Sequence, residues 1–555
     1  MSEAALPNAA GPAPAVQAAI EGRALFDNTI ERAHWATLGL VRRKRLGQFW
    51  TPYAVARFMA AWLTPTEGEI CDPAAGAGVF ARALLDPARP IGRGRTLRAL
   101  DLDPGMTEVV SALARRLPDM TLVVESRDYF ELPGDMRFGA VIVNPPYLNH
   151  ADIAAKAGLA ALVSAETGLR PSGLSNLYIY FLVRLAKQLS AGGRMAAIVP
   201  AEFLDSTYGR AVKRHLLRTD LLRAVVSFGS GASIFEGAMT TATILLLENN
   251  PRPGRHRPVA FRQVEDEGEL AAFESLLASS PFDPAALGTL LEPDPLRPWR
   301  PYVSGLAPLT RTGYVPLGEL AVAQHGFTTG DNSFFLRRAS ELAAAQLSKT
   351  WCTPTDGRSS YVPGPFFRAS DLATLDTADR AIWLLTFDAS SAAEPAAEAY
   401  LSSAAAQAAA ARPSARGRRP WWRQARRIVA PVWISNLSRG RVKVVRNETR
   451  AMPLDHFHTL APRPELSELA ARALVAYTGT TEFATSLRTA AREYGSGMLK
   501  IETREMLEVA VLDVRRLSDA MARRVIAADD EWRTASTDRA AAAHAVLDTL
   551  FAKRR

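Results

Sequence analysis

Residues 70–80 read Ile70-Cys71-Asp72-Pro73-Ala74-Ala75-Gly76-Ala77-Gly78-Val79-Phe80. The apolar start predicts a short buried strand, and the residues after the glycines predict a helix. Glycines let a backbone approach a ligand closely, and a helix start offers free N–H groups to it. Because a lone Gly-x-Gly pair is a weak signal, the neighbouring segments decide whether this is the ligand-binding turn of an α/β sheet.

Three further strand-like segments follow, and a polar residue comes after each of them. The segment 96–100 leads to Asp101, about where dinucleotide-binding folds place an acid for two ribose hydroxyls. The next two segments are followed by Asp128 and Asn144. Each acid is also compatible with a helix cap. Since the carboxyl ends of parallel strands meet at one sheet edge, we expect these residues and Asp72 to form a site.

The tetrapeptide Asn144-Pro145-Pro146-Tyr147 follows the fourth strand-like segment. The Asn144 side-chain oxygen and a backbone carbonyl beside Pro145 are able to accept both hydrogen bonds from one NH2 group. Two prolines stiffen the loop and Tyr147 offers a stacking face, so the tetrapeptide predicts a clamp for a planar aromatic amine. Taken alone, it is also compatible with a proline-rich turn after a strand.

These segments together resemble the motifs of class I methyltransferases that use S-adenosylmethionine, specifically N6-adenine DNA methyltransferases of the gamma arrangement. The stretch 45–52, Arg-Leu-Gly-Gln-Phe-Trp-Thr-Pro, resembles the motif that these enzymes carry before the glycine turn. The resemblance covers residues 40–250 closely. It implies an α/β fold with a Rossmann-like, mostly parallel sheet of seven strands, followed by a C-terminal α+β target-recognition domain.

The resemblance also implies catalytic roles. Asn144 and Pro145, with Pro146 and Tyr147, would bind the N6 amino group of an adenine and keep its lone pair on the nitrogen for direct methylation. Tyr147 and Phe235 would stack on that adenine after it is flipped out of the duplex. Phe235 is equally compatible with a core aromatic residue.

S-adenosylmethionine is the cofactor that the resemblance implies. Thr51 would contact its carboxylate, Asp101 its ribose, and Asp128 with Tyr129 its adenine. The amino-acid end would lie on the glycine turn, whose implied binding residues are Asp72, Pro73, Ala74, Gly76 and Gly78. No metal is implied.

Other methyltransferase chemistries fit these residues less well. A C5-cytosine enzyme needs a cysteine nucleophile, and the chain has only Cys71 and Cys352. Cys71 lies in the first strand-like segment, where a small buried residue is expected. N4-cytosine enzymes usually carry Ser in place of Asn144. Glutamine methyltransferases and several RNA base methyltransferases share the tetrapeptide. Only the rest of the chain can therefore distinguish a DNA methyltransferase from these two classes.

The length of 555 residues predicts more than one domain. We expect a disordered N-terminal extension over 1–30, a catalytic domain over 31–255 and a connecting segment over 256–300. A target-recognition domain with terminal helices is expected over 301–555, because the stretch that begins near Tyr314 resembles the opening of such a domain. This addition argues against the glutamine and small RNA enzymes.

The charge balance of 66 Lys and Arg against 57 Asp and Glu gives a formal net charge of +9, which suits a polyanionic partner. The densest basic cluster lies in 412–427 and includes Trp421 and Trp422. It is either a phosphate-tracking surface with stacking platforms or a solvated loop beside two core tryptophans. A second basic run occupies 42–45, and such runs are usually solvated.

These observations predict a site-specific DNA adenine methyltransferase that acts on double-stranded DNA. It would protect DNA in a restriction-modification system, with a separately encoded restriction endonuclease, or act alone. The alternatives are an RNA base N-methyltransferase and a non-catalytic DNA-binding specificity subunit. Two cysteines, no secretory signal and no apolar run of about 20 residues predict a cytoplasmic protein without a membrane span.

Overall fold

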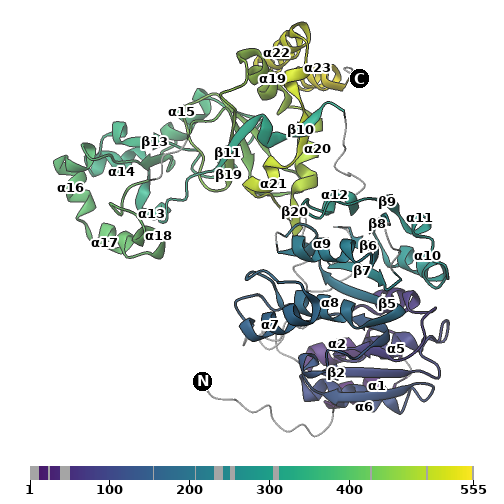
Figure 1. The fold of residues 1–555 in the computed structure, drawn as a ribbon. Coiled ribbons are helices and arrows are strands. Elements are labelled where there is room, and N and C mark those ends of the chain that lie inside the picture. The colour runs from purple at the N-terminus through teal and green to yellow at the C-terminus, as the bar shows by residue number, and fades with distance from the viewer. Residues whose placement is uncertain are drawn as a thin grey trace. The chain divides into compact units, whose positions relative to one another are not determined.

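The computed structural model describes residues 12–22, 25–37, 50–153, 156–206, 208–229, 242–250, 257–303, 312–424, 428–494 and 498–552. The chain divides into two compact units, 1–307 and 308–555, each with its own hydrophobic core (Figure 1).

The first unit is built on one large sheet. Its strands are β1 (Ile70–Asp72), β2 (Thr96–Asp101), β3 (Thr121–Ser126), β4 (Phe138–Val143), β5 (Leu189–Pro200), β6 (Leu222–Phe228), β7 (Ala242–Glu248), β8 (Val259–Val264) and β9 (Thr289–Leu291). Their order is β3-β2-β1-β4-β5-β7-β6-β8-β9, and β7 and β9 run antiparallel to their neighbours. The strand order reverses between β1 and β4, and such a switch point leaves a crevice at the carboxyl ends of the strands. The mostly parallel, Rossmann-like sheet agrees with the expectation, but it has nine strands and not the expected seven, because β8 and β9 extend it beyond β6.

Helices cover both faces of this sheet. They are α1 (Pro14–Glu21), α2 (Thr29–Thr37), α4 (Tyr53–Trp62), α5 (Val79–Leu84), α6 (Pro104–Ala114), α7 (Lys156–Thr167), α8 (Leu177–Lys187), α9 (Gly209–Arg218), α10 (Glu267–Leu277), α11 (Pro284–Leu287) and α12 (Arg300–Val303), with 3-10 turns η1 (Tyr129–Glu131) and η2 (Ala201–Leu204). Successive side chains along each strand point to opposite faces of the sheet, so the core consists of two clusters, one on each face. In β4, Ala140 and Ile142 pack with α4 and α5, whereas Val141 and Val143 pack with α8 on the other face. Both faces are therefore buried, which explains why β4 is apolar at nearly every position.

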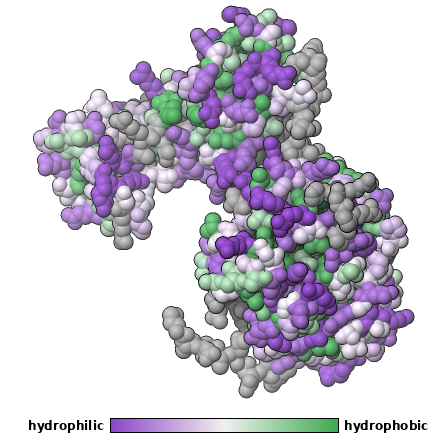
Figure 2. Space-filling view, in the orientation of Figure 1, coloured by the Kyte–Doolittle hydropathy of each residue, from purple (hydrophilic) through white to green (hydrophobic). Residues whose placement is uncertain are grey.

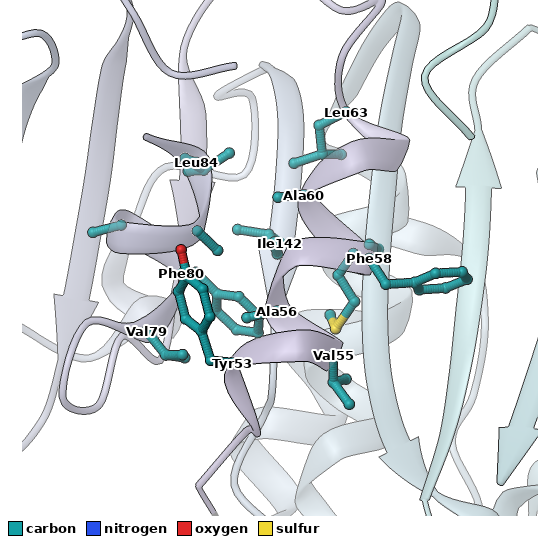
Figure 3. Packing of buried hydrophobic residues seen from close by; sticks show 14 of the residues in the cluster. Tyr53, Val55, Ala56, Phe58, Ala60, Leu63, Val79, Phe80, Leu84 and Ile142 are labelled. Atoms are coloured by element: carbon teal, nitrogen blue, oxygen red, sulfur yellow. The ribbon is translucent and has the colours of Figure 1, made fainter. Parts of the chain in front are cut away.

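Helix α4 is apolar around most of its circumference, and this matches its burial. Val55, Ala56, Phe58 and Met59 are all fully buried between α5 and the sheet, together with Ile142 from β4 (Figure 3). A helix that is apolar around most of its surface belongs inside a core. Helix α4, which begins two residues after Thr51, consequently shares a buried cluster with Ile142 of β4.

The expected disorder of residues 1–30 is wrong for the part that the structure describes. Val16 and Ile20 of α1 are buried against the sheet side that carries α4 and α6, and Leu25 and Ile30 extend the same cluster. The alanine- and proline-rich composition suggested a disordered tail. Val16 and Ile20, however, are four residues apart and so lie on the same face of α1, and the core buries that face. Tyr53 N also donates to the Asn28 side chain at 2.7 Å.

The expected boundaries at 255 and 300 are also wrong. Strands β8 and β9 and helix α10 lie within 256–300 and complete the sheet of the first unit, which runs to residue 307. The many prolines of this stretch lie between these elements and do not form a linker. The predicted helix near 270–277 is present as α10, where Leu270 and Leu277 are fully buried.

The second unit is α+β. Its strands are β10 (Tyr314–Pro316), β11 (Ala321–His325), β12 (Leu336–Arg337), β13 (Cys352–Pro354), β14 (Phe366–Phe367), β15 (Trp383–Leu385), β16 (Val432–Ser435), β17 (Leu437–Arg439), β18 (Val444–Asn447), β19 (Phe457–Pro462), β20 (Arg492–Tyr494), β21 (Met498–Lys500) and β22 (Ala510–Leu512). The largest of its sheets has the order β11-β19-β16-β18-β14. This agrees with the expected α+β character.

The helices of the second unit surround these small sheets. They are α13 (Asn332–Phe335), α14 (Ala339–Ala344), α15 (Ala369–Thr377), α16 (Pro395–Leu401), α17 (Ala404–Ala410), α18 (Pro413–Arg416), α19 (Glu468–Tyr477), α20 (Thr481–Ala490), α21 (Thr503–Leu507), α22 (Asp519–Thr534) and α23 (Ala540–Ala552), with 3-10 turns η3 (Leu317–Glu319), η4 (Lys349–Trp351), η5 (Ser359–Tyr361), η6 (Ser391–Ala393) and η8 (Val514–Arg516). The predicted terminal helices are α22 and α23, which share a buried cluster with α19 that includes Val525 and Leu547.

The two tryptophans of the basic cluster contribute to a core. The Trp421 ring lies 5.5 Å from that of Phe334, and Trp422 lies 6.3 Å from Phe387. Arg418 donates to the carbonyls of Thr328 and Thr329, both at 2.9 Å. The geometry therefore favours the core interpretation over stacking platforms. Residues 42–45 and 425–427 lie outside the described part of the chain.

Hydrophilic side chains are spread over the face seen in Figure 2, with small hydrophobic patches between them. None of the described helices is long and apolar enough to cross a membrane.

Candidate functional site

A cavity in the first unit opens at the carboxyl ends of β1, β2 and β4. The residues that line it are Glu31, His34, Trp50, Thr51, Pro73, Ala74, Ala75, Gly76, Ala77, Val79, Phe80, Asp101, Leu102, Asp103, Met106, Arg127, Asp128, Tyr129, Asn144, Pro145, Pro146, Leu148, Leu177 and Phe181. Ten of the predicted site residues are among them. Asp72, Gly78 and Tyr147 lie behind this lining, and Phe235 lies outside the described residues.

The glycine turn is shaped by two left-handed residues, Gly76 at φ +51° and Gly78 at φ +78°. A Cβ on Gly78 would lie 2.7 Å from the Leu113 side chain of α6, so this glycine permits close packing between helices. A Cβ on Gly76 would meet no protein atom within 4 Å and would project into open space beside the cavity. Gly76 therefore leaves room for a ligand, as an exposed cradle requires.

Asp101 ends β2 and holds the glycine turn in place. Its two carboxylate oxygens accept hydrogen bonds from Gly76 N and Asp103 N, each at 2.9 Å. Burial raises the pKa of Asp101 to about 6, and the nearby Asp103 charge acts in the same direction. Its neighbour Leu102 is 67% exposed and lines the cavity, so it leaves an apolar side chain there.

Asp72 has a structural position in the turn. It is 1% exposed and accepts a hydrogen bond from Ala74 N at 3.3 Å. Burial raises the pKa of Asp72 well above its usual value, and the Asp101 charge adds to this effect. The adjacent Cys71 is fully buried, and burial also raises the pKa of its thiol, so it has the properties of a core residue and not of a nucleophile.

Asn144 and Thr51 meet at the cavity from different parts of the chain. The Asn144 side-chain NH2 donates to the Thr51 hydroxyl at 3.0 Å. Thr51 is 3% exposed and lies two residues before α4, whose N-cap is Pro52, whereas Asn144 directly follows β4. Because α4 is buried against β4, the core fixes the distance between these two side chains.

Tyr147 is anchored from behind the cavity. Its hydroxyl donates to the Ile198 carbonyl at 3.3 Å, and its ring lies edge-on to Tyr178 at 6.3 Å. Tyr178 shares a hydrogen bond of 3.0 Å with the hydroxyl of Tyr208, which donates to Glu202 at 2.9 Å. Burial raises the pKa of Tyr147, so its hydroxyl stays protonated. These contacts restrict the orientation of the ring beside the tetrapeptide.

Asp128 and Tyr129 form the wall that follows β3. Asp128 caps η1 by accepting from Phe130 N at 2.9 Å, so the capping role considered from the sequence is present in a residue that lines the cavity. Tyr129 is 2% exposed, its hydroxyl donates to Gln188 at 2.5 Å, and its ring stacks on Phe181 at 5.0 Å. Tyr129 thus offers an aromatic surface and not a free hydroxyl.

Sequence reasoning missed several lining residues. Leu102 was within reach of a sequence argument, because it directly follows Asp101, which was itself predicted to line the site. Glu31, His34 and Phe181 gave no local signal, since they come from helices that only the fold brings to the cavity. No group of three or more His, Cys, Asp or Glu side chains within the described ranges is placed to hold a metal ion.

Three sequence families match the chain. The family described as Type II methyltransferase M.Eco57I, C-terminal domain, matches residues 305–546. The Eco57I restriction-modification methylase family matches 116–235, and the N-6 DNA Methylase family matches 36–85. The first match falls within the second unit except at its start, and the other two fall within the first unit.

Curated relatives align over most of the chain. Type II methyltransferase M.AccI of Acinetobacter calcoaceticus is 26% identical over 497 residues, which cover 88% of this chain and 89% of the relative. Type II methyltransferase M.XamI of Xanthomonas campestris pv. amaranthicola is 27% identical over 486 residues, which cover 86% and 87%. The crystal structure of the type IIG restriction endonuclease BpuSI has a TM-score of 0.42 and 14% identity, covering 90% of this chain and 64% of that one.

Proposed function

The chain belongs to the N6-adenine DNA methyltransferases of type II restriction-modification systems, and on this premise we propose that its cavity binds cofactor and target base side by side. The observation that carries this proposal is the hydrogen bond between Asn144 and Thr51. It joins the tetrapeptide expected to bind the base to a residue expected to bind the cofactor. The fold and the family imply S-adenosylmethionine as the methyl donor.

The cavity fits this cofactor. Gly76 leaves space at the turn, Asp101 offers a carboxylate for ribose hydroxyls, and Leu102 offers an exposed apolar side chain for an adenine ring. Asp128 and the aromatic surface of Tyr129 would contact the adenine edge, and Thr51 the carboxylate of the methionine end. When bound, S-adenosylmethionine supplies an electrophilic methyl group on a sulfonium sulfur.

Asn144 would activate the nucleophile. Its side-chain oxygen and the carbonyl beside Pro145 accept the two protons of the adenine N6 amine, which keeps the nitrogen lone pair from delocalising into the ring. Thr51 would orient the amide by accepting one hydrogen bond from its NH2 group. Tyr147, with its ring held by Tyr178, would stack on the adenine after extrusion from the duplex.

The second unit would select the DNA sequence. Its match to the C-terminal domain of a type II methyltransferase over 305–546 supports this role. Two relatives named as type II methyltransferases align along nearly their whole length. As the partner we propose a separately encoded restriction endonuclease. Modification of genomic double-stranded DNA in bacteria would take place in the cytoplasm.

Expression of the full chain in a bacterial host without adenine methylation tests the proposed function. Single-molecule sequencing of the host genome is expected to reveal N6-methyladenine at one short DNA motif. Genomic DNA that stays unmodified, although the purified chain binds S-adenosylmethionine, would contradict methylation of DNA by this chain alone. Labelled methyl transfer to cellular RNA in that case would favour the RNA alternative.

Cofactor affinity is expected to fall in acidic solution. With a pKa of about 6, the Asp101 carboxyl is charged at pH 7 and protonated at pH 5. Protonation removes acceptor capacity that the ribose hydroxyls need, so the Kd for S-adenosylmethionine should rise by up to about tenfold per pH unit below 6. Calorimetric titration between pH 5 and pH 8 measures this change.

The matched variant for that titration is Asp101→Asn. It should bind more weakly than the wild type at pH 7 and should lose the component of the pH dependence that Asp101 contributes. Any dependence that remains would belong to other acids of the site, such as Asp72. A wild-type Kd that is constant from pH 5 to pH 7 would contradict the ribose role of Asp101.

A further inference from the structure

Helix α2 brings an acid to the cavity that no motif predicts. Glu31 lines the cavity together with Val79 and Phe80, which form the first turn of α5. Arg82, one turn further along α5, holds Glu31 in a buried ion pair. Glu31 is therefore fixed beside the helix that starts at the glycine turn, close to where the amino-acid end of the cofactor is expected.

Glu31 is held in place by Arg82, which makes several hydrogen bonds of its own. Glu31 is 3% exposed and Arg82 is fully buried. The Arg82 guanidinium donates to the Leu25 carbonyl at 2.7 Å, to the Asp27 carbonyl at 2.8 Å and to one carboxylate oxygen of Glu31. These contacts tie the segment before α2 to α5, so neither partner of the ion pair is free to turn toward solvent.

The other carboxylate oxygen of Glu31, Oε2, is buried and has no hydrogen-bond partner among the described residues. A buried carboxylate oxygen without a donor is costly, and most such atoms in proteins are satisfied. Burial also raises the pKa of Glu31 against the opposing effect of Arg82. A cationic donor that enters the cavity would satisfy the oxygen and keep the carboxylate charged.

We propose that Glu31 Oε2 accepts a hydrogen bond from the α-ammonium group of the bound methyl donor, which makes α2 part of the cofactor site. The inference rests on the proposed function, because it assumes that S-adenosylmethionine occupies the cavity. A zwitterionic amino-acid end needs an acceptor for its ammonium group and a donor for its carboxylate. Glu31 meets the first need, as the Thr51 hydroxyl is expected to meet the second.

Calorimetry on the full chain with three probes tests this inference. S-adenosylmethionine and S-adenosylhomocysteine carry the amino-acid end, whereas 5′-methylthioadenosine lacks it. Glu31→Gln is expected to weaken binding of the first two by about tenfold to a hundredfold and to leave 5′-methylthioadenosine within about twofold. Glu21→Gln, at the exposed end of α1, is the matched control and should change none of the three affinities.

Each outcome has a distinct meaning. A wild-type chain that binds none of the probes would overturn the proposed function together with the inference. Equal affinities in wild type and Glu31→Gln, or an equal loss for all three probes, would overturn the inference alone and leave Glu31 a structural residue. If Glu31→Gln fails to fold, Glu31→Asp decides, because it keeps the charge beside Arg82 and should selectively weaken the two amino-acid-bearing probes about fivefold.

Discussion

Replacement of Asn144 by alanine is expected to lower methyl transfer at least about a thousandfold while the Kd for S-adenosylmethionine stays within about threefold. The variant removes the acceptor that keeps the lone pair on the adenine nitrogen, and losing one preorganised hydrogen-bonding group at a reacting centre has effects of about this size. Cofactor binding should survive, because Gly76 and Asp101 are held by contacts that do not involve Asn144.

Single-turnover transfer of a labelled methyl group to duplex DNA that carries the mapped motif measures the first part, and calorimetry measures the second. Asn149→Ala, an exposed asparagine two residues beyond Tyr147, is the matched control and should retain more than about half of the rate. Turnover of Asn144→Ala within tenfold of wild type would disprove the amine clamp. Loss of cofactor binding would instead make Asn144 a cofactor residue.

Replacement of Gly139 by alanine is expected to prevent stable folding of the first unit. Gly139 is the second residue of β4, and a Cβ there would lie 1.6 Å from the Glu67 carbonyl oxygen. Neither side can move easily, because Gly139 N and Ala140 N both donate to Glu69 O, at 3.0 and 3.2 Å. A backbone clash of this kind should cost more than about 4 kcal/mol, which is a large share of the stability of a typical domain.

Thermal unfolding and limited proteolysis of the purified variants measure this effect. Gly158→Ala, in α7, is the matched control, because a Cβ at that position meets no atom within 4 Å. It should be neutral or stabilising by up to about 1 kcal/mol, as alanine is the better helix former. A Gly139→Ala chain with an unchanged Tm would show that the start of β4 is free to shift.

The central part of the fold was predictable because its signals are local. The glycine turn, the acids after β2 and β3 and the tetrapeptide after β4 each follow a strand that alternation and apolar runs reveal. The parallel sheet then brings them to one edge. Ten predicted residues line the cavity, and nine of them could be placed there from local signals and the parallel sheet alone. The tenth, Thr51, was placed by the family motif.

The features that the sequence did not predict depend on contacts between residues that are distant in the sequence. Val16 and Ile20 look like part of a disordered tail until the α4 and α6 side of the sheet is present to cover them. Prolines in 256–300 suggest a linker, although β8 in this stretch pairs with β6 and β9 pairs with β8. Glu31 has no neighbour in sequence that marks it, because its ion-pair partner Arg82 is 51 residues away.

The hydrogen bond between Asn144 and Thr51 has a thermodynamic consequence. One pair of side chains is expected to face both ligands, so a shift of either side chain on binding the first ligand changes the free energy of binding the second. Such coupling is reciprocal by necessity. If occupancy of the cofactor site tightens binding of the cognate duplex tenfold, the duplex must tighten cofactor binding by the same factor, and the enzyme would hold its methyl donor most firmly when it has found its target sequence.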